Sequence, residues 1–375
     1  MSFHIGPIRP PSEADSLLLQ ITNGCTWNKC KFCGLYKHTR FRTYSADDIK
    51  KDIDNMRALA DIAEKYRRGS DWDIDGLNIE LAGMNGEERQ CFAMVANWLI
   101  NGTGSVFLQD GNSLILRDGR LSEVLRYLKA KFPDVTRITS YGRAENLSKM
   151  TAEDFAELKD AGLDRIHSGF ESGSDEVLKL VGKGTTSEQQ IAAGRAVKAG
   201  GIELSVYFMP GLGGKALSEE NAKGMARVVN AVKPDFLRIR TCAVKPETEL
   251  YRDMEEGRFI LAGDDDKVRE LKILVSLCEG GGKIVSDHII NLLPYVEGHM
   301  ENDKSRMLAI IDEYLAMPED MRKLYQLGRR LCHIGSPGQM GLLPPQTTAR
   351  LNKICEETPA EEWDMMINSI IARYI

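Results

Sequence analysis

Short apolar runs alternate with amphipathic stretches over roughly the first 250 residues, and this alternation constrains the fold more than any other feature. The apolar runs that read as strands are 16–24, 105–111, 136–144, 164–172, 202–211 and 236–244. Strands that alternate with helices of this length predict an α/β fold with a parallel sheet and right-handed crossovers. About six strand–helix units are fewer than the eight of a closed barrel, so a partial barrel and an open doubly wound sheet both fit.

Capping signals fix where several of the helices begin and end. Ser45 precedes a long amphipathic stretch, 45–68, and is expected to cap it. Thr151 with Asp154 forms a capping-box pattern, and Gly162 is placed to end the helix that follows. These signals separate helix from loop without any knowledge of the tertiary structure.

The pattern changes after about residue 256, where we expect no further strong strand. Four stretches read as helices instead: 264–280, 304–317, 319–331 and 360–374. The acidic run Asp264–Asp266 is most simply a helix-start charge run. The sequence therefore predicts two domains, a partial barrel over 1–255 and a helical C-terminal region over 256–375.

Composition excludes several classes of protein. Hydrophobic residues make up 42% and charged residues 28% of the 375, which is typical of a globular protein with a sizeable core. A net charge of −6 gives no global basic field, so nucleic acid is not an expected partner. The polar N-terminus and the absence of a run near the roughly 18 apolar residues of a membrane span favour a cytoplasmic protein without membrane partners.

Three of the eight cysteines cluster in the segment GCTWNKCKFCGLY, residues 24–36. Cys25, Cys30 and Cys33 have the spacing C-x4-C-x2-C, which indicates metal or redox chemistry rather than a disulfide framework. Three thiolates on a 4Fe–4S cluster leave one iron open to a substrate or cofactor. A zinc site with His38 as fourth ligand, or three unrelated thiols, are the alternatives.

The cysteine segment after the first strand resembles the radical S-adenosylmethionine (SAM) superfamily. The resemblance covers roughly residues 16–250 and implies a partial (β/α)6 TIM-like barrel that uses a 4Fe–4S cluster and SAM. In that family an aromatic residue commonly precedes the last cysteine and lies near the adenine, which here is Phe32. The usual spacing is C-x3-C-x2-C, so this chain carries one extra residue between Cys25 and Cys30.

The segment HSGFESGSDEVLKLVGKGTT, 167–186, resembles the branch that contains the elongator acetyltransferase, methylthiotransferases and coproporphyrinogen dehydrogenase. The resemblance places SAM contacts at the ends of successive strands: Asp110, Gly111, Asn112, Arg143, Glu145, Glu171, Ser172, Lys183 and Met209. Each also has a plainer interpretation, as a tight turn, a helix cap or an ordinary loop. Their joint position at strand ends favours a ligand site, because ligands bind there in such folds.

The resemblance implies an enzyme that reductively cleaves SAM to a 5′-deoxyadenosyl radical, which abstracts hydrogen from a substrate. Its partners would be a small-molecule or peptide substrate and an electron donor such as flavodoxin or ferredoxin. A cluster or haem carrier of the same fold, or a structural zinc protein, are the alternatives. Cys242 is a candidate hydrogen-atom donor or added ligand, although a buried thiol is the simpler interpretation.

Three further residues are candidates of unassigned role. Arg238 and Arg240 alternate with apolar residues on one predicted strand. They can face the barrel and bind an anionic substrate, or be solvated or salt-bridged. His288 is expected at a helix start with a structural role.

Overall fold

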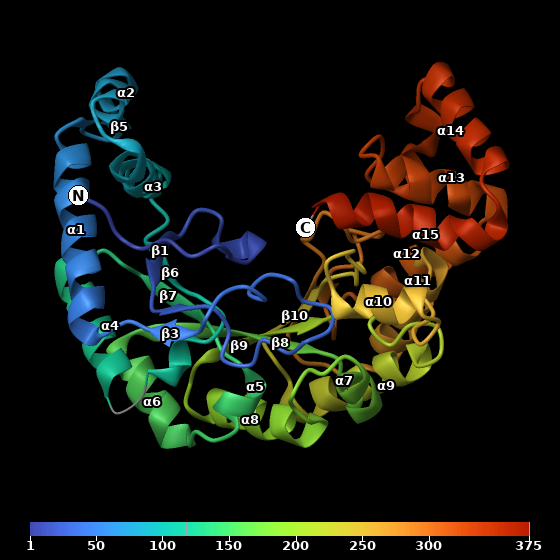
Figure 1. Cartoon of the computed structure of the whole chain (residues 1–375), viewed down its shortest axis with the longest axis horizontal. Coiled ribbons are helices and arrows are strands. Elements are labelled where there is room, and N and C mark those ends of the chain that lie inside the picture. Colours follow the sequence, from blue (N-terminus) through green and yellow to red (C-terminus); the bar gives the residue numbers. More distant parts are fainter. Residues whose placement is uncertain (117–118, 375) are drawn as a thin grey trace. The chain divides into compact units, whose positions relative to one another are not determined.

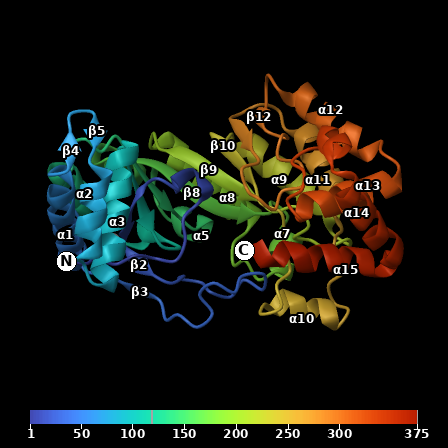
Figure 2. The same ribbon diagram turned by 90° about the horizontal axis from the view of Figure 1, so that it is seen from above.

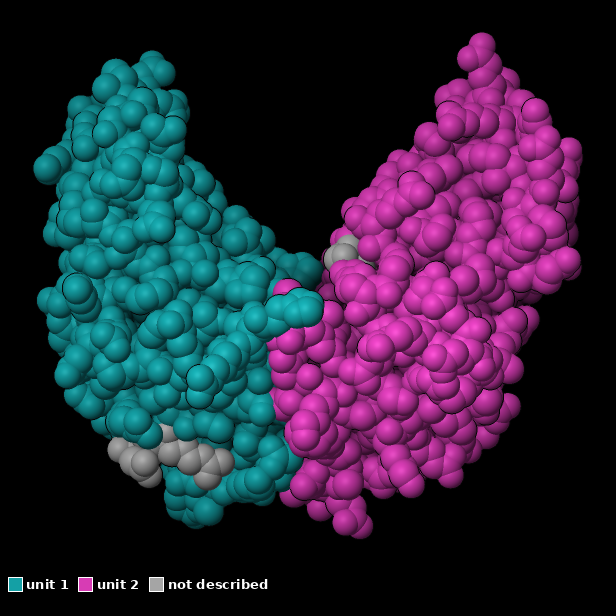
Figure 3. Space-filling view, in the orientation of Figure 1, with its two compact units in different colours: residues 1–26, 38–167, 196–203 teal, residues 27–37, 168–195, 204–375 magenta. Residues whose placement is uncertain are grey.

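The computed structural model describes residues 1–116 and 119–374, which divide into two compact units (Figure 3). Unit 1 comprises residues 1–26, 38–167 and 196–203, and unit 2 comprises 27–37, 168–195 and 204–375. The predicted domain boundary near residue 256 lies inside unit 2 and stays a prediction.

Unit 1 is built on parallel strands in the order β1-β6-β7-β8. Their bounds are β1 Leu17–Gln20, β6 Ser105–Gln109, β7 Arg137–Tyr141 and β8 Leu163–Glu171, of which residues 163–167 belong to this unit. Every residue of β1 and β6 is buried, as expected for a parallel sheet covered on both faces. Two short antiparallel pairs accompany it: β2 Thr22–Asn23 with β3 Arg42–Thr43, and β4 Arg67–Arg68 with β5 Asp71–Trp72.

The helices of unit 1 form where the sequence places their caps. They are α1 Ala46–Glu64, α2 Ile74–Ala82, α3 Gly86–Asn101, α4 Arg120–Lys131, α5 Ala144–Leu147 and α6 Ala152–Ala161. The predicted cap Ser45 and the predicted capping box of Thr151 with Asp154 are both confirmed, and the structure adds a capping box between Ser45 and Asp48. Gly162 ends α6 in the left-handed conformation that glycine adopts without strain. Figure 2 shows α1, α2 and α3 packed side by side.

Unit 2 has its strands in the order β8-β9-β10-β11-β12. The strands are residues 168–171 of β8, β9 Glu203–Phe208 (of which residues 204–208 belong to this unit), β10 Phe236–Ile239, β11 Lys283–Val285 and β12 Gly298–His299. All pair in parallel except β12, which runs antiparallel to β11. After residue 256 the described part of the sheet gains two short strands, β11 of three residues and β12 of two. Neither is the strong strand that the sequence was expected to lack there, because so few residues give no periodic signal.

The two faces of β9 and β10 differ in chemistry. Leu204, Val206, Phe208 and Leu237 are fully buried apolar residues that alternate with Ser205, Tyr207 and Arg238. A Cβ on Gly194 of α8 (Ser187–Ala199) would lie 2.4 Å from Val232 of α9 (Ser218–Val232) and 3.2 Å from Leu204. The apolar face therefore packs beneath α8 and α9, and the polar face is directed away from them.

The rest of unit 2 is largely helical, as predicted. Its other helices are α7 Asp175–Leu180, α10 Glu249–Glu255, α11 Asp264–Leu277, α12 Lys304–Leu315, α13 Glu319–Arg330, α14 Pro345–Glu357 and α15 Ala360–Ile371. Figure 1 shows α13, α14 and α15 gathered together near the C-terminus. The predicted α/β class is thus confirmed: parallel strands joined by helices, the alternation of a partial TIM-like barrel, precede C-terminal helices. In the described part of the chain no helix is long and apolar enough to cross a membrane.

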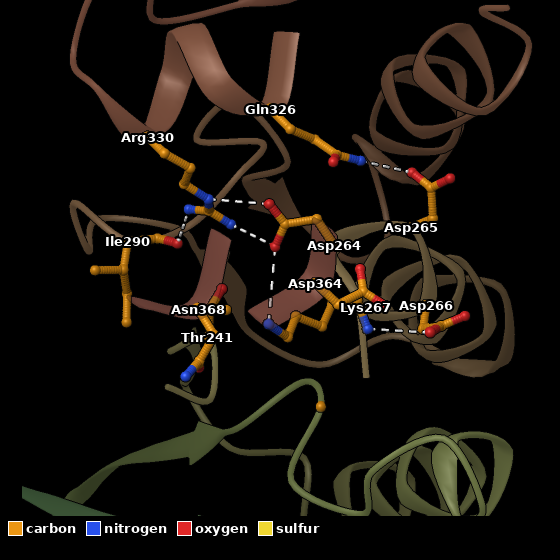
Figure 4. A network of polar contacts seen from close by, with 12 residues as sticks. Thr241, Asp264, Asp265, Asp266, Lys267, Ile290, Gln326, Arg330, Asp364 and Asn368 are labelled. Atoms are coloured by element: carbon orange, nitrogen blue, oxygen red, sulfur yellow. Dashed lines mark hydrogen bonds and ion pairs between the residues drawn. The ribbon is translucent and has the colours of Figure 1, made fainter. Parts of the chain in front are cut away.

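A buried ion-pair network joins the start of α11 to α13 (Figure 4). Asp264 is 2% exposed, and its carboxylate receives both Nε (3.0 Å) and Nη2 (2.7 Å) of Arg330. Lys267 Nζ lies 3.8 Å from the same carboxylate, and Asp265 accepts hydrogen bonds from Tyr314 and Gln326. The acidic run does stand at a helix start, but two of its members connect helices rather than face solvent.

Candidate functional site

Cys25 lies in unit 1 beside an arginine that the sequence analysis had singled out. Arg143 Nη1 is 3.9 Å from Cys25 Sγ, the distance of a long N–H···S hydrogen bond. The backbone N–H of Arg143 donates to Asn112 Oδ1 at 3.3 Å, and Asn112 Nδ2 donates to Asn146 Oδ1 at 2.7 Å. This contact places a positive charge beside the sulfur of Cys25.

The predicted turn Asp110-Gly111-Asn112 packs directly on the residues around Cys25. Asp110 is fully buried and accepts hydrogen bonds from Gln20 Nε2 (2.8 Å) and from the backbone N–H of Gly24 (3.3 Å). A Cβ on Gly111 would lie 3.4 Å from Gly24 O and 3.7 Å from Cys25 Cα. Asp110 therefore holds the backbone that leads into Cys25, and its predicted contact with the SAM ammonium stays a prediction.

Glu145 is not brought to this cluster. Its carboxylate forms an i,i+4 ion pair with Lys149 on the adjoining turn. Of the two candidates that follow β7, the structure thus places Arg143 at a cysteine and directs Glu145 to a neighbouring lysine.

Cys30 and Cys33 belong to unit 2, where residues 27–37 are held by segments far away in the sequence. The backbone N–H of Lys31 donates to Val181 O at 2.8 Å, and its carbonyl accepts from Leu250 N at 2.9 Å. Trp27 Nε1 donates to Gly182 O at 2.7 Å. Gly184 has φ +68°, and a Cβ there would lie 2.3 Å from the Trp27 ring, so only glycine fits. The glycines of the motif VGKGTT therefore provide the surface on which the cysteine segment rests.

Lys183, Glu171 and Phe32 form one connected group in unit 2. Lys183 Nζ lies 3.1 Å from Glu171 Oε1 and 5.6 Å from the centre of the Phe32 ring, a cation–π distance. Glu171 ends β8 with φ +65°, a conformation that side-chain-bearing residues seldom adopt and that often marks a functional position. Three residues predicted from sequence thus meet at one strand end.

Ser172 takes a local structural role beside this group. It is buried, and its Oγ accepts from the backbone N–H of Ser174 at 3.1 Å. Its carbonyl accepts from Gln190 Nε2 at 2.9 Å. The hydroxyl therefore shapes the turn between β8 and α7, and its predicted contact with SAM stays a prediction.

Met209 and Cys242 lie in an apolar cluster against which Phe32 packs. Met209 follows β9, and its N–H donates to Glu171 O at 2.8 Å. Cys242 is 1% exposed, and burial raises the pKa of its thiol to about 12. A thiol in such surroundings stays protonated, which suits a packed core residue and not a thiolate ligand.

Glu270 of α11 is a functional candidate that the sequence analysis missed. Its carboxylate accepts from the backbone N–H of Gly211 (3.1 Å to each oxygen), from Ser218 Oγ (2.9 Å) and from Asn221 Nδ2 (2.7 Å). Burial raises its pKa to about 7. Glu270 therefore fixes the loop after β9, next to Met209. No local pattern marks it, because its partners lie 49 to 59 residues earlier.

The three cysteines are not assembled into a metal-binding group in the structure. Among residues 1–116 and 119–374, no three His, Cys, Asp or Glu side chains lie together in a way that could hold a metal ion. The assignment of a cluster to Cys25, Cys30 and Cys33 rests on their spacing and on the residues around each of them, and it stays a prediction.

Comparison with known families identifies the central part of the chain. Residues 82–223 match the model of the radical SAM superfamily, so the chain carries a radical SAM domain. Proteins of this superfamily use SAM and a 4Fe–4S cluster. The matched residues include Asp110, Arg143, Glu171 and Lys183 and begin after the cysteine segment.

Individual proteins also resemble the chain. The 4′-phospho-dehydrooxetanocin synthase of Priestia megaterium is 29% identical over 303 residues, 79% of this chain and 34% of that protein. The heme chaperone HemW of Bacillus subtilis is 22% identical over 180 residues, 48% of this chain and 47% of that protein. The chain thus spans between a third and a half of the length of these relatives. The solved coproporphyrinogen III oxidase of Escherichia coli is 16% identical with a TM-score of 0.45, over 70% of this chain and 51% of that one.

Proposed function

We propose that this protein is a radical SAM enzyme in which Cys25, Cys30 and Cys33 ligate a 4Fe–4S cluster. The observation that carries the proposal is a three-cysteine segment in a chain that has a radical SAM domain. When bound, the cluster supplies one electron that cleaves SAM to methionine and a 5′-deoxyadenosyl radical, which then abstracts hydrogen from the substrate.

The donor set fits such a cluster. Cys25 and Cys33 are half-buried thiols, and Cys25 has the guanidinium of Arg143 beside its sulfur. Cys91, Cys242 and Cys278, by contrast, are buried where desolvation raises the pKa of each thiol. Exposure thus separates Cys25 and Cys33 from these three thiols, whereas Cys30 is buried, so the choice of ligands rests mainly on the spacing of the segment.

The other residues of the proposed site bind and orient SAM. Lys183, paired with Glu171 and stacked over Phe32, offers a positive charge for the SAM carboxylate. Phe32 and Met209 offer an apolar surface for the adenine. Glu270 holds the loop that begins at Met209 in one conformation, so that this surface is formed before SAM arrives.

The test is anaerobic reconstitution with iron and sulfide, followed by dithionite and SAM, with 5′-deoxyadenosine measured by chromatography. The wild type should hold about four irons per chain and form 5′-deoxyadenosine. Cys25→Ala, Cys30→Ala and Cys33→Ala should each lose the cluster and the product. Cys355→Ala, which removes a half-buried thiol outside the segment, is the matched control and should keep both.

Two results would contradict the proposal in different ways. Zinc bound without iron would point to the structural zinc protein. A complete cluster that never cleaves SAM, with or without added haem, would favour the carrier alternative, which the likeness to the heme chaperone HemW supports.

A further inference from the structure

The polar face of β9 and β10 continues past the end of β10. Arg240 comes two residues after Arg238, and its N–H donates to Phe208 O at 2.9 Å, so the parallel ladder reaches it. Side chains alternate along a strand, so Arg240 shares the face of Arg238, away from α8 and α9. This face thus carries two arginines at its carboxyl end, where ligands bind in parallel α/β folds.

The two arginines differ in how their charges are compensated. Arg238 is 4% exposed, donates from Nε to Ser205 Oγ at 3.1 Å and forms an ion pair with Asp287. Arg240 is half-buried, and no carboxylate in residues 1–116 or 119–374 forms an ion pair with it. Arg238 is therefore neutralised by its own chain, whereas Arg240 keeps an uncompensated positive charge at the strand end.

A second donor comes from the segment that follows β11. Asn291 fixes this segment on the end of β10: its Oδ1 accepts from Thr241 N (3.1 Å) and Thr241 Oγ1 (3.0 Å), and its Nδ2 donates to Ile239 O (2.8 Å). His288 follows Asp287, the ion-pair partner of Arg238, and the charge of Arg240 acts on the His288 ring, so the two side chains lie near each other. His288 is thereby held beside Arg240, in a loop and not at the helix start expected from sequence.

The hydrogen bonding of His288 sets its tautomer. Nδ1 accepts from the backbone N–H of Ile290 at 3.3 Å, so the neutral ring carries its proton on Nε2. Burial, with the nearby charge of Arg240, lowers the pKa of His288 to about 4, so the ring is neutral at pH 7. Within the described ranges Nε2 has no hydrogen-bond partner and presents an N–H donor.

We propose that Arg240 and His288 form a subsite for an oxyanion, a phosphate or carboxylate group, of the substrate. The proposal rests on the proposed function in so far as it assigns the group to the substrate of that reaction. A guanidinium with several N–H donors and an imidazole N–H match two oxygens of one anion, and charge-assisted bonds of this kind are strong. The substrate class is thus a small molecule that carries a phosphate or carboxylate.

The test uses inorganic phosphate as the probe on the full chain with ¹⁵N-labelled histidine, in the absence of reductant. Imidazole signals are followed by NMR at constant ionic strength, with His288→Gln to assign the ring. Phosphate should shift the His288 signals along a saturating curve. Arg240→Gln should weaken binding by about tenfold or more, and Arg240→Lys by less. Arg126→Gln, which removes an exposed charge in unit 1, is the control and should bind as the wild type does.

The outcomes separate this proposal from the function proposed above. No saturable shift in the wild type, or equal phosphate affinity in Arg240→Gln, would overturn the subsite even if SAM is cleaved. Competition between SAM and phosphate would assign the donors to the SAM carboxylate and overturn the assignment to the substrate. Phosphate binding that SAM leaves unchanged supports it, and this result does not depend on turnover.

Discussion

Two carboxylates six residues apart on α11 are both nearly fully buried, yet they are stabilised in opposite ways. Asp264, at the first turn, faces Arg330 and Lys267. Glu270, in the middle of the helix, accepts hydrogen bonds from the neutral donors of Gly211, Ser218 and Asn221. Burial acts against the charge on both, but the two cations lower the pKa of Asp264 below its usual value, whereas the pKa of Glu270 rises to about 7.

The difference shows that nearby cations offset the desolvation of a buried carboxylate, whereas neutral hydrogen-bond donors offset it only in part. It also sets opposite pH dependences. The contribution of Asp264 to stability is present above its usual pKa of 3.8 and is lost as the pH falls below it. The contribution of Glu270 is fully present below pH 4.5 and is lost as the pH rises through about 7, because the folded state then holds a charge that its partners compensate only in part.

The largest effect is expected from breaking the ion pair at the start of α11. Arg330→Met leaves Asp264 buried without its main cation and should lower the free energy of unfolding by about 3–5 kcal/mol in urea titrations. Arg329→Met, one residue earlier and half-buried, should cost less than about 1 kcal/mol. Asp264→Asn combined with Arg330→Met should recover part of the loss. Equal stabilities of Arg330→Met and Arg329→Met would show that the Asp264–Arg330 ion pair does not stabilise the fold.

The next largest effect is the pH dependence of the free energy of unfolding that the ionisation of Glu270 causes. Glu270→Gln keeps an acceptor but cannot ionise, so its stability relative to the wild type should rise between pH 5 and pH 8, by up to about 3 kcal/mol in total. Urea unfolding at several pH values measures this difference. Glu313→Gln, an exposed carboxylate on α12, is the control and should show no such trend. A difference that stays constant across this range would mean that Glu270 ionises normally.

The smallest effect concerns Lys267, which lies between Asp264 and Glu270 in the sequence of α11. Lys267 lowers the pKa of both, but Asp264 also has Arg330, so Lys267→Met should act mainly on Glu270. We expect the midpoint of the pH-dependent stability loss to move to higher pH by about half a unit to one unit. Lys272→Met, on the exposed side of the same helix, should leave the midpoint unchanged. A shift to lower pH would contradict the proposed electrostatics.

Signals within a few residues predicted most helices and strands of the fold. Contacts between residues far apart in the sequence could not be predicted from such signals. Ser45, Thr151 and Gly162 mark helix ends because capping is decided within a few residues. The strand Lys283–Val285 and the helix Pro345–Glu357 were not anticipated, because the first is very short and the second opens on proline without a capping side chain.

The residues of the candidate site fall into the same two groups, those with a local sequence signal and those whose contacts are long-range. Cys25, Cys30 and Cys33 are apparent from spacing alone, and strand ends led to Arg143, Glu171 and Lys183. Glu270 was missed because its partners come from a different strand–helix unit, and no periodicity links the two. Asp110 lies at the end of β6 as expected, but its hydrogen bonds to Gln20 and Gly24 depend on tertiary packing, and its contact with SAM stays a prediction.

The anchoring of Lys31 between Val181 and Leu250 has a consequence for the order of events during synthesis. Cys30 and Cys33 leave the ribosome early, but the backbone groups that hold their segment emerge about 150 and 220 residues later. At about 5–20 residues per second, the thiols wait for ten seconds or more before the segment can adopt its final conformation. Iron and sulfur delivered to the nascent chain would meet a segment without its anchors, so we expect the proposed cluster to be inserted after Leu250 has been translated.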